Sequence, residues 1–171
     1  MFGQEISVYL NSLLYKSSLL DYLVYFTAQI LPFILLICVF IFFLVIKKDV
    51  KDFLLISLIV GFSWGFSEIL KLIFSSPRPF VADTEFSPLF IFGGNDSFPS
   101  GHATVFGALA MAVYYENKKF GILFAVCAIL ISVSRVISGV HYLADVLAGL
   151  LIGFVIVYLG YKYLGKLRNK S

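Results

Sequence analysis

The chain has 171 residues, of which 60% are hydrophobic and 13% are charged, and its formal net charge at pH 7 is +3. A soluble domain is typically about half apolar and about a quarter charged, so this composition excludes an ordinary soluble enzyme. It predicts a single integral membrane domain over residues 1–171, built from helices because the apolar stretches are too long and continuous for barrel strands.

The first 18 residues carry apolar side chains at helical spacing, with Gln4, Glu5 and Asn11 between them. This pattern predicts an amphipathic helix over residues 1–18 that lies along the outer membrane surface with one face in lipid. The alternative is a frayed terminus. We expect no cleavable signal peptide, because the segment has neither a basic start nor a long apolar run.

Five apolar stretches follow, and each is predicted to be a membrane-spanning helix. The predicted spans are residues 22–46, 53–75, 100–116, 120–138 and 143–164. Pro32 is expected to kink the first. The third is short, as a helix would be if its outer end stopped inside a polar recess. The predicted fold is therefore an all-α membrane bundle of about five spans plus the interfacial helix.

Basic residues give the expected orientation. Nine of the 13 Lys and Arg residues lie in two loops and the C-terminal tail: Lys47, Lys48, Lys51, Lys118, Lys119, Lys162, Lys166, Arg168 and Lys170. By the positive-inside rule these regions are cytoplasmic. We expect a multi-pass protein of the cell inner (plasma) membrane with a cytoplasmic C-terminus. The bias accounts for the net charge, which therefore gives no indication of a nucleic-acid partner.

The segment KLIFSSPRP covers the end of the second span and the residues just after it, and it supplies Lys71 and Arg78. The two are seven residues apart, or two helical turns, but Pro77 and Pro79 place Arg78 just beyond the helix end. Lys71 alone would be compatible with snorkelling to the interface, and Glu68 could pair with it in a structural role. The long outer loop that follows, residues 80–98, is either a lid or a segment seated among the lipid headgroups.

The segment PSGH opens the third span. Ser100 suits a helix N-cap, and Gly101 lets a ligand approach the backbone amides closely. A helix N-terminus presents free N–H groups and partial positive charge, so it is suited to an anion. His102 comes directly after this predicted anion site.

The segment SRVISGVHYLAD joins the last two spans and contains Arg135, His141 and Asp145. Polar groups next to hydrocarbon are costly to keep, so they indicate a functional site. His141 and Asp145 are four residues apart and would share a helix face, where the carboxylate would orient the imidazole. Further on, Gly149 and Gly153 form a GxxxG pattern that predicts close helix packing within the bundle.

These three segments are expected to meet on the outer face. They bring together three cations, which repel one another unless an anion of comparable charge lies among them. Phosphate fits, and the guanidinium group of arginine matches its oxygens well. Acidic clusters for Mg²⁺ and His/Cys sets for Zn²⁺ are absent from the sequence, so we predict phosphoryl chemistry without metal or other cofactor.

In this order, the three segments resemble the signature motifs of the type 2 phosphatidic acid phosphatase family. Every defining position is filled: Lys71, Arg78, Pro79, Pro99, Ser100, Gly101, His102, Ser134, Arg135, His141 and Asp145. Many family members have six spans, so this chain would be a compact version.

The resemblance implies a site and a reaction. His141 would be the nucleophile, forming a phosphohistidine, while Asp145 orients it and His102 acts as general acid and then base. The phosphate oxygens would be held by Lys71, Arg78, Ser100, Gly101 and Arg135. The implied substrate is a membrane lipid phosphate or diphosphate: undecaprenyl diphosphate, lipid A 1-phosphate or phosphatidylglycerophosphate.

Three other functions are compatible with parts of this pattern. A vanadium haloperoxidase has a similar site, because vanadate mimics phosphate, but those enzymes are soluble. A non-catalytic phospholipid-binding membrane protein would use the same cations without needing His141. A small channel or transporter is disfavoured, because charged residues are not buried deep in several spans.

Overall fold

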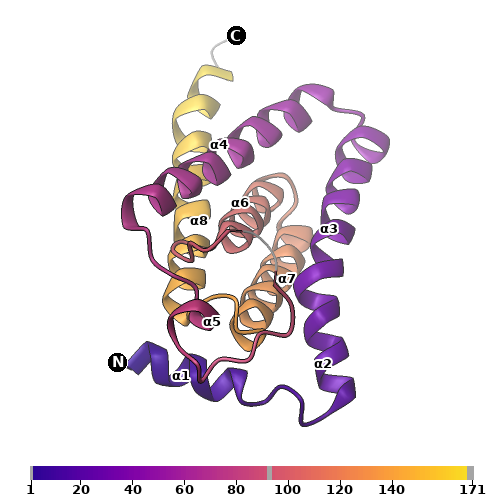
Figure 1. Ribbon diagram of the computed structural model, residues 1–171. Coiled ribbons are helices and arrows are strands. Elements are labelled where there is room, and N and C mark those ends of the chain that lie inside the picture. The colour runs from indigo at the N-terminus through magenta and orange to yellow at the C-terminus, as the bar shows by residue number, and fades with distance from the viewer. Residues whose placement is uncertain (1, 92–93, 169–171) are drawn as a thin grey trace.

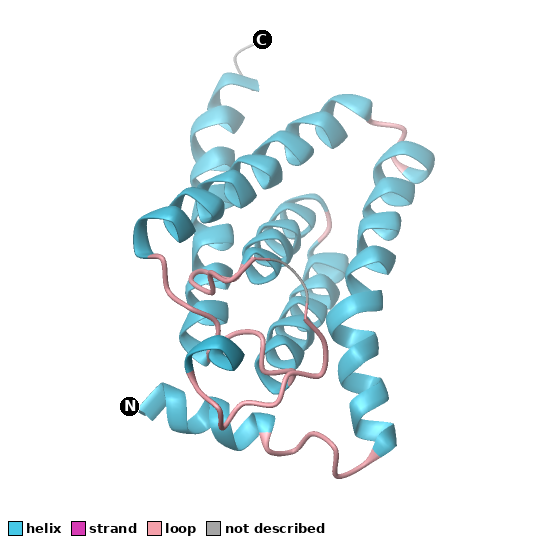
Figure 2. Cartoon of the chain, viewed as in Figure 1, coloured by secondary structure: helices cyan, strands magenta, loops and turns pink. Residues whose placement is uncertain are grey.

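The computed structural model describes residues 2–91 and 94–168, and every regular element within these ranges is a helix (Figures 1 and 2). The predicted all-α fold is confirmed. Of the predicted cytoplasmic basic residues, Lys170 lies outside the described part of the chain.

The first span is a continuous helical rod over Ser18–Ile46. It consists of α2 (Ser18–Tyr25), a π-helical segment (Phe26–Ile30), α3 (Leu31–Phe40) and a second π-helical segment (Ile41–Ile46). Pro32 lies in the first turn of α3, directly after the first π-helical segment. The expected irregularity at Pro32 therefore takes the form of a widened turn, which accommodates a residue that has no backbone N–H to donate.

The other long helices are α4 (Val50–Phe74), α7 (Lys118–Ile137) and α8 (Leu143–Arg168), each with a segment long and apolar enough to cross a membrane. The helix α6 (Gly101–Glu116) is shorter, and most of its first 13 residues are buried. Figure 1 shows α6 enclosed by α4, α7 and α8. A short helix in the middle of the bundle brings its N-terminus, with His102, to an interior site.

Close packing of α6 on α8 depends on the two glycines of the GxxxG pattern. A Cβ atom on Gly153 would lie 2.2 Å from the Thr104 carbonyl oxygen, and one on Gly149 would lie 2.5 Å from the Ser100 carbonyl oxygen. The predicted packing within the bundle is confirmed. Without a strong hydrophobic drive between helices in lipid, such backbone contact is a main source of association.

We therefore expect Gly153→Ala to destabilise the protein by about 1–3 kcal/mol, because the added methyl group forces α6 and α8 apart. The matched control is Gly61→Ala on α4, where a Cβ atom would meet no other atom within 4 Å. Thermal unfolding in detergent should show a lower midpoint for Gly153→Ala and an unchanged or slightly raised one for Gly61→Ala. Equal midpoints for the two variants would refute this account of the packing.

The helix α1 (Phe2–Asn11) lies across one end of the bundle (Figure 1). Asn11, predicted to lie on the polar face, is instead buried. Its Nδ2 donates to the carbonyl oxygens of Ser87 (3.0 Å) and Ile137 (2.9 Å), and its Oδ1 accepts from the Ser87 N–H. Leu143 N–H donates to Ser7 Oγ at 3.0 Å. The helix thus fastens the loop that contains Ser87 to the turn between α7 and α8.

The opposite end of the bundle holds two of the basic clusters. There Lys47 forms an ion pair with Glu116, and the Tyr161 hydroxyl donates to Glu116 at 3.2 Å. These contacts tie the end of the first span to the ends of α6 and α8. The basic loops and the α1 end are therefore separated by the length of the bundle.

Candidate active site

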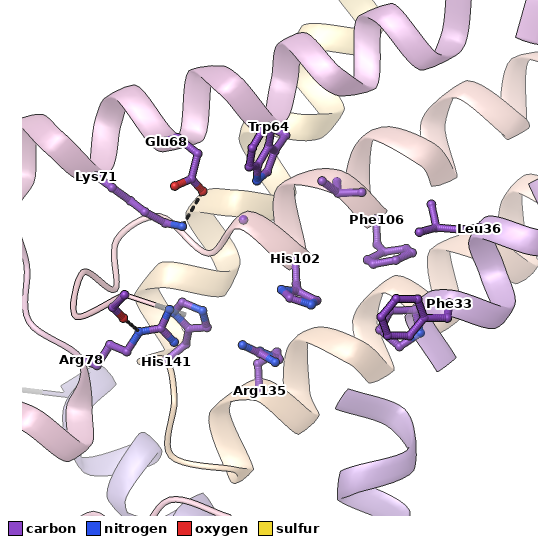
Figure 3. Close-up of a pocket in the computed structure, with 14 residues that line it drawn as sticks. Phe33, Leu36, Trp64, Glu68, Lys71, Arg78, His102, Phe106, Arg135 and His141 are labelled. Atoms are coloured by element: carbon purple, nitrogen blue, oxygen red, sulfur yellow. Dashed lines mark hydrogen bonds and ion pairs between the residues drawn. The ribbon is translucent and has the colours of Figure 1, made fainter. Parts of the chain in front are cut away.

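The three polar segments meet in one cavity of about 390 Å³, shown in Figure 3. Six of the eight residues predicted for the site line it: Lys71, Arg78, Gly101, His102, Arg135 and His141. The remaining two, Ser100 and Asp145, are buried and are not among the lining residues. Ser134 also stays outside the lining, and its hydroxyl donates to the Ile131 carbonyl oxygen within α7.

Arg78 is one of the two arginines that line the cavity. Arg78 follows the end of α4, as predicted, and precedes the short helix α5 (Pro79–Ala82). Its Nε donates to the Gly94 carbonyl oxygen at 2.6 Å, and its Nη1 donates to that of Val140 at 3.2 Å. These two bonds fix the guanidinium group. Burial lowers the pKa of Arg78, while Asp145 is the largest opposing influence.

Arg135 is only 1% exposed, yet its Nε and Nη1 have no hydrogen-bond partner among the described residues. Its guanidinium carbon lies 5.3 Å from the centre of the Phe90 ring, a cation–π contact. A buried cation without an ionic partner is costly, so a structure that keeps one at a cavity wall is suited to an anionic ligand.

Lys71 is paired with Glu68, as the sequence suggested, with 2.6 Å between Nζ and Oε1 (Figure 3). A Cβ atom on Gly101 would lie 3.3 Å from Glu68 Oε1 and 3.5 Å from Lys71 Nζ. The pair therefore lies over the N-terminus of α6. Glu68 also lines the cavity, which the sequence did not indicate.

Ser100 occupies the N-cap position of α6 with extended backbone, but its side chain makes no capping hydrogen bond. Ser100 thus lies at the predicted N-cap position, but the prediction that its side chain caps the helix is wrong. Its Oγ is buried and has no partner among the described residues, while its N–H donates to the Asp145 carbonyl oxygen at 3.0 Å. The Ser100 hydroxyl therefore makes no hydrogen bond to the first turn of α6.

His141 and Asp145 are close together, as predicted, but they are not brought together by a shared helix face. His141 precedes α8, which begins at Leu143, so the two residues do not share a helix face. Nδ1 of His141 lies 3.5 Å from Asp145 Oδ2, and the Ser97 hydroxyl contacts both atoms. Ser97 Oγ is 3.2 Å from His141 Nδ1 and donates to Asp145 Oδ2 at 2.5 Å. The helix predicted from the four-residue spacing does not include His141, because the chain turns at Gly139, which has a φ of +73°.

Ser97, whose side chain is fully buried, was not predicted from the sequence to belong to the site. The one available signal was its place three residues before Ser100, inside a motif-bearing loop. Its partners are 44 and 48 residues away, so neither contact can be inferred from local spacing.

Burial lowers the pKa of His141 to about 4, against the opposing influence of its interaction with Asp145. The imidazole is therefore neutral at pH 7. A neutral imidazole keeps one nitrogen lone pair free, which is what a nucleophile requires.

This pKa can be measured directly, because the chain has two histidines. In a His102→Gln variant without a purification tag, His141 is the one histidine left. Its imidazole NMR signals should titrate with a midpoint near pH 4, because desolvation disfavours the charged ring. A midpoint near 6.5, the ordinary value, would show that the ring is solvated.

Comparison with known proteins gives the family. The model of the PAP2 superfamily matches residues 52–169, which include all three polar segments. The chain belongs to the PAP2 superfamily. Among curated relatives, undecaprenyl-diphosphatase BcrC of Bacillus subtilis (strain 168) is 34% identical over 100 residues, 58% of this chain and 51% of the relative. The chain thus spans about half the length of this relative.

A lipid A 1-phosphatase of Rhizobium etli is 40% identical over 68 residues, which are 40% of this chain and 29% of the relative. Among solved structures, Aquifex aeolicus LpxE has a TM-score of 0.74 and 28% identity, covering 95% of this PAP2 chain and 96% of that one. The phosphatidylglycerolphosphate phosphatase of Bacillus subtilis has a TM-score of 0.65 and 26% identity, with coverages of 95% and 86%.

Proposed function

We propose that this PAP2 protein is a metal-independent phosphatase that hydrolyses a membrane lipid phosphate or diphosphate through a phosphohistidine intermediate. The observation that carries the proposal is the shared cavity, in which Arg135, a buried cation with unpartnered donors, faces the two histidines. Arg78 and Lys71 add two further cations on the walls. Within the described residues, no three His, Cys, Asp or Glu side chains form a candidate metal site.

The proposed reaction has two steps. Nε2 of His141 attacks phosphorus, and the bond from phosphorus to the oxygen that joins it to the rest of the lipid breaks. His102, in its protonated form, donates a proton to that oxygen. His102 then takes a proton from water, whose oxygen attacks the phosphohistidine and releases inorganic phosphate and free His141. Arg78, Arg135, Lys71, Ser100 and the Gly101 amide hold the phosphoryl oxygens in both steps.

The rest of the cavity wall supports a lipid as the substrate. Pro32, Phe33 and Leu36 of the first span line it together with Trp64 of α4 and Phe106 of α6. Phe33 and Trp64 are 66% and 52% exposed, so the apolar side of the cavity reaches the surface of the bundle. A phosphate group in the cavity could therefore keep its hydrocarbon chain in the bilayer.

The candidate lipids are undecaprenyl diphosphate, lipid A 1-phosphate and phosphatidylglycerophosphate, which correspond to the names of relatives and of similar structures. We further propose that the cavity opens on the outer face of the inner membrane, with the C-terminus in the cytoplasm. The support is the separation of the α1 end of the bundle from the basic loops around Lys47 and Lys118, which the positive-inside rule assigns to the cytoplasm.

A panel of these three lipids in mixed micelles containing EDTA tests the proposal, with His141→Ala as the blank. We expect phosphate release from at least one lipid, at a rate that EDTA does not lower. Release that requires added Mg²⁺ would refute the metal-independent mechanism. Halide oxidation with added vanadate and without phosphatase activity would favour a haloperoxidase, and lipid binding without turnover would favour a binding protein.

A further inference from the structure

Ser97 is buried beside His141, and backbone hydrogen bonds hold it in place. Its N–H donates to the Ser76 carbonyl oxygen at 2.7 Å, and the adjacent Arg78 N–H donates to the Asn95 carbonyl oxygen at 2.9 Å. An isolated antiparallel bridge between Pro77 and Asp96 joins the same two segments. The loop that carries Ser97 is thereby fixed to the segment that carries Arg78.

The hydrogen-bond directions around Ser97 follow from what each group can donate. An ionised carboxylate only accepts, so the single hydroxyl proton of Ser97 goes to Asp145 Oδ2, 2.5 Å away. The oxygen of Ser97 can then only accept from His141, 3.2 Å away, which requires the hydrogen of the imidazole to be on Nδ1. The lone pair is left on Nε2.

The remaining contacts of Asp145 agree with an orienting role. Its Oδ2 also accepts the Tyr142 N–H at 2.8 Å, and its backbone carbonyl oxygen accepts the Ser100 N–H at 3.0 Å. The carboxylate is thus held by the first turn of α8, while its reach to Nδ1 is 3.5 Å. At that distance the direct hydrogen bond is weak. The two contacts that run through Ser97, at 3.2 and 2.5 Å, are both shorter.

We propose that Ser97 is a positioning residue that relays the charge of Asp145 to His141 and selects the tautomer with a free Nε2. The inference rests on the proposed function and deepens it. When phosphorus bonds to Nε2, the ring becomes positively charged, and the Nδ1–H bond to Ser97 and onward to Asp145 strengthens. The hydrogen on Nδ1 stays there while Nε2 attacks phosphorus. The attack therefore needs no proton transfer to Ser97 or Asp145.

The test is a double-mutant cycle of Ser97→Ala and Asp145→Asn, assayed on whichever panel lipid the wild-type protein hydrolyses. We expect Ser97→Ala to lower kcat by about 10–100-fold with little change in KM, by analogy with the loss seen when a group that orients a metal-bound histidine is removed. The double variant should be no slower than Asp145→Asn alone, because the two residues act as one chain. Ser63→Ala is the matched control, since Ser63 is an equally buried serine that donates only to the Ile59 carbonyl oxygen of its own helix.

A second readout reports on the tautomer. Imidazole ¹⁵N NMR of the His102→Gln protein should show the hydrogen on Nδ1, and adding Ser97→Ala should move it towards Nε2. If Ser97→Ala fails to fold, Ser97→Cys keeps the side-chain volume with a much weaker donor and should show the same changes.

Different results would overturn the positioning role of Ser97 and the proposed phosphatase function. If His141→Ala abolishes turnover but Ser97→Ala behaves like Ser63→Ala, Ser97 has no positioning role. Fully additive losses in the cycle, with the hydrogen still on Nδ1, would also overturn the relay. If His141→Ala itself retains activity, the proposed function fails first.

Discussion

His141→Ala should lower lipid phosphate release by about 10⁴-fold or more, because it removes the atom that accepts the phosphoryl group. His141 is 2% exposed and its pKa is about 4, so at pH 7 the wild-type ring is neutral and available for attack. With a ³²P-labelled lipid and an alkaline quench, label should appear on the wild-type protein and be absent from His141→Ala. Heating at acid pH should remove the label, as expected for a phosphorus–nitrogen bond.

The matched variant is His102→Ala, which changes the other histidine of the cavity. With a lipid analogue whose leaving group needs no proton, this variant should still become phosphorylated, but it should lose the label slowly because no base activates water. Label that depends on His102 and survives in His141→Ala would reverse the two assigned roles.

Arg135→Met should stabilise the ligand-free protein while lowering turnover by about 10²–10³-fold, the usual cost of losing one preorganised donor. Arg135 is 1% exposed with two unpartnered donor atoms, so the folded protein bears the cost of desolvating its charge. Replacing buried charge by apolar side chains of similar volume has stabilised other proteins by about 1–4 kcal/mol. Thermal unfolding in detergent, with and without orthovanadate, measures both effects.

Orthovanadate should raise the unfolding midpoint of the wild-type protein and leave that of Arg135→Met unchanged, because a bound anion stabilises only the form that binds it. Lys16→Gln is the control, since Lys16 is an exposed cation on the same side of the bundle but outside the cavity. Its response to vanadate should match the wild type. A less stable Arg135→Met that still responds to vanadate would show that Arg135 is a structural cation.

The helices could be predicted because membrane spans are long, apolar and local in sequence. The gathering of Lys71, Arg78, His102, Arg135 and His141 could also be predicted, since each lies next to a span end on one side. The contacts that orient these side chains could not be predicted. Ser97 and Asn11 reach partners between 44 and 126 residues away, and no periodicity encodes such distances.

Two local expectations failed for identifiable reasons. His141 and Asp145 have helical spacing, but the left-handed backbone at Gly139 ends α7 in a turn that carries His141 outside α8. Ser100 has the residue type and position of an N-cap, yet its buried hydroxyl makes no bond to the helix. In both cases the site overrides the local preference, as is common where function constrains the chain.

The most direct measurement is an experimental structure of the protein with orthovanadate, which imitates the phosphoryl group in transfer. We expect vanadium bonded to Nε2 of His141, with its oxygens in contact with Arg78 and Arg135 and with His102 on the side opposite the bond. Vanadate bound elsewhere, or bonded to His102, would contradict this prediction.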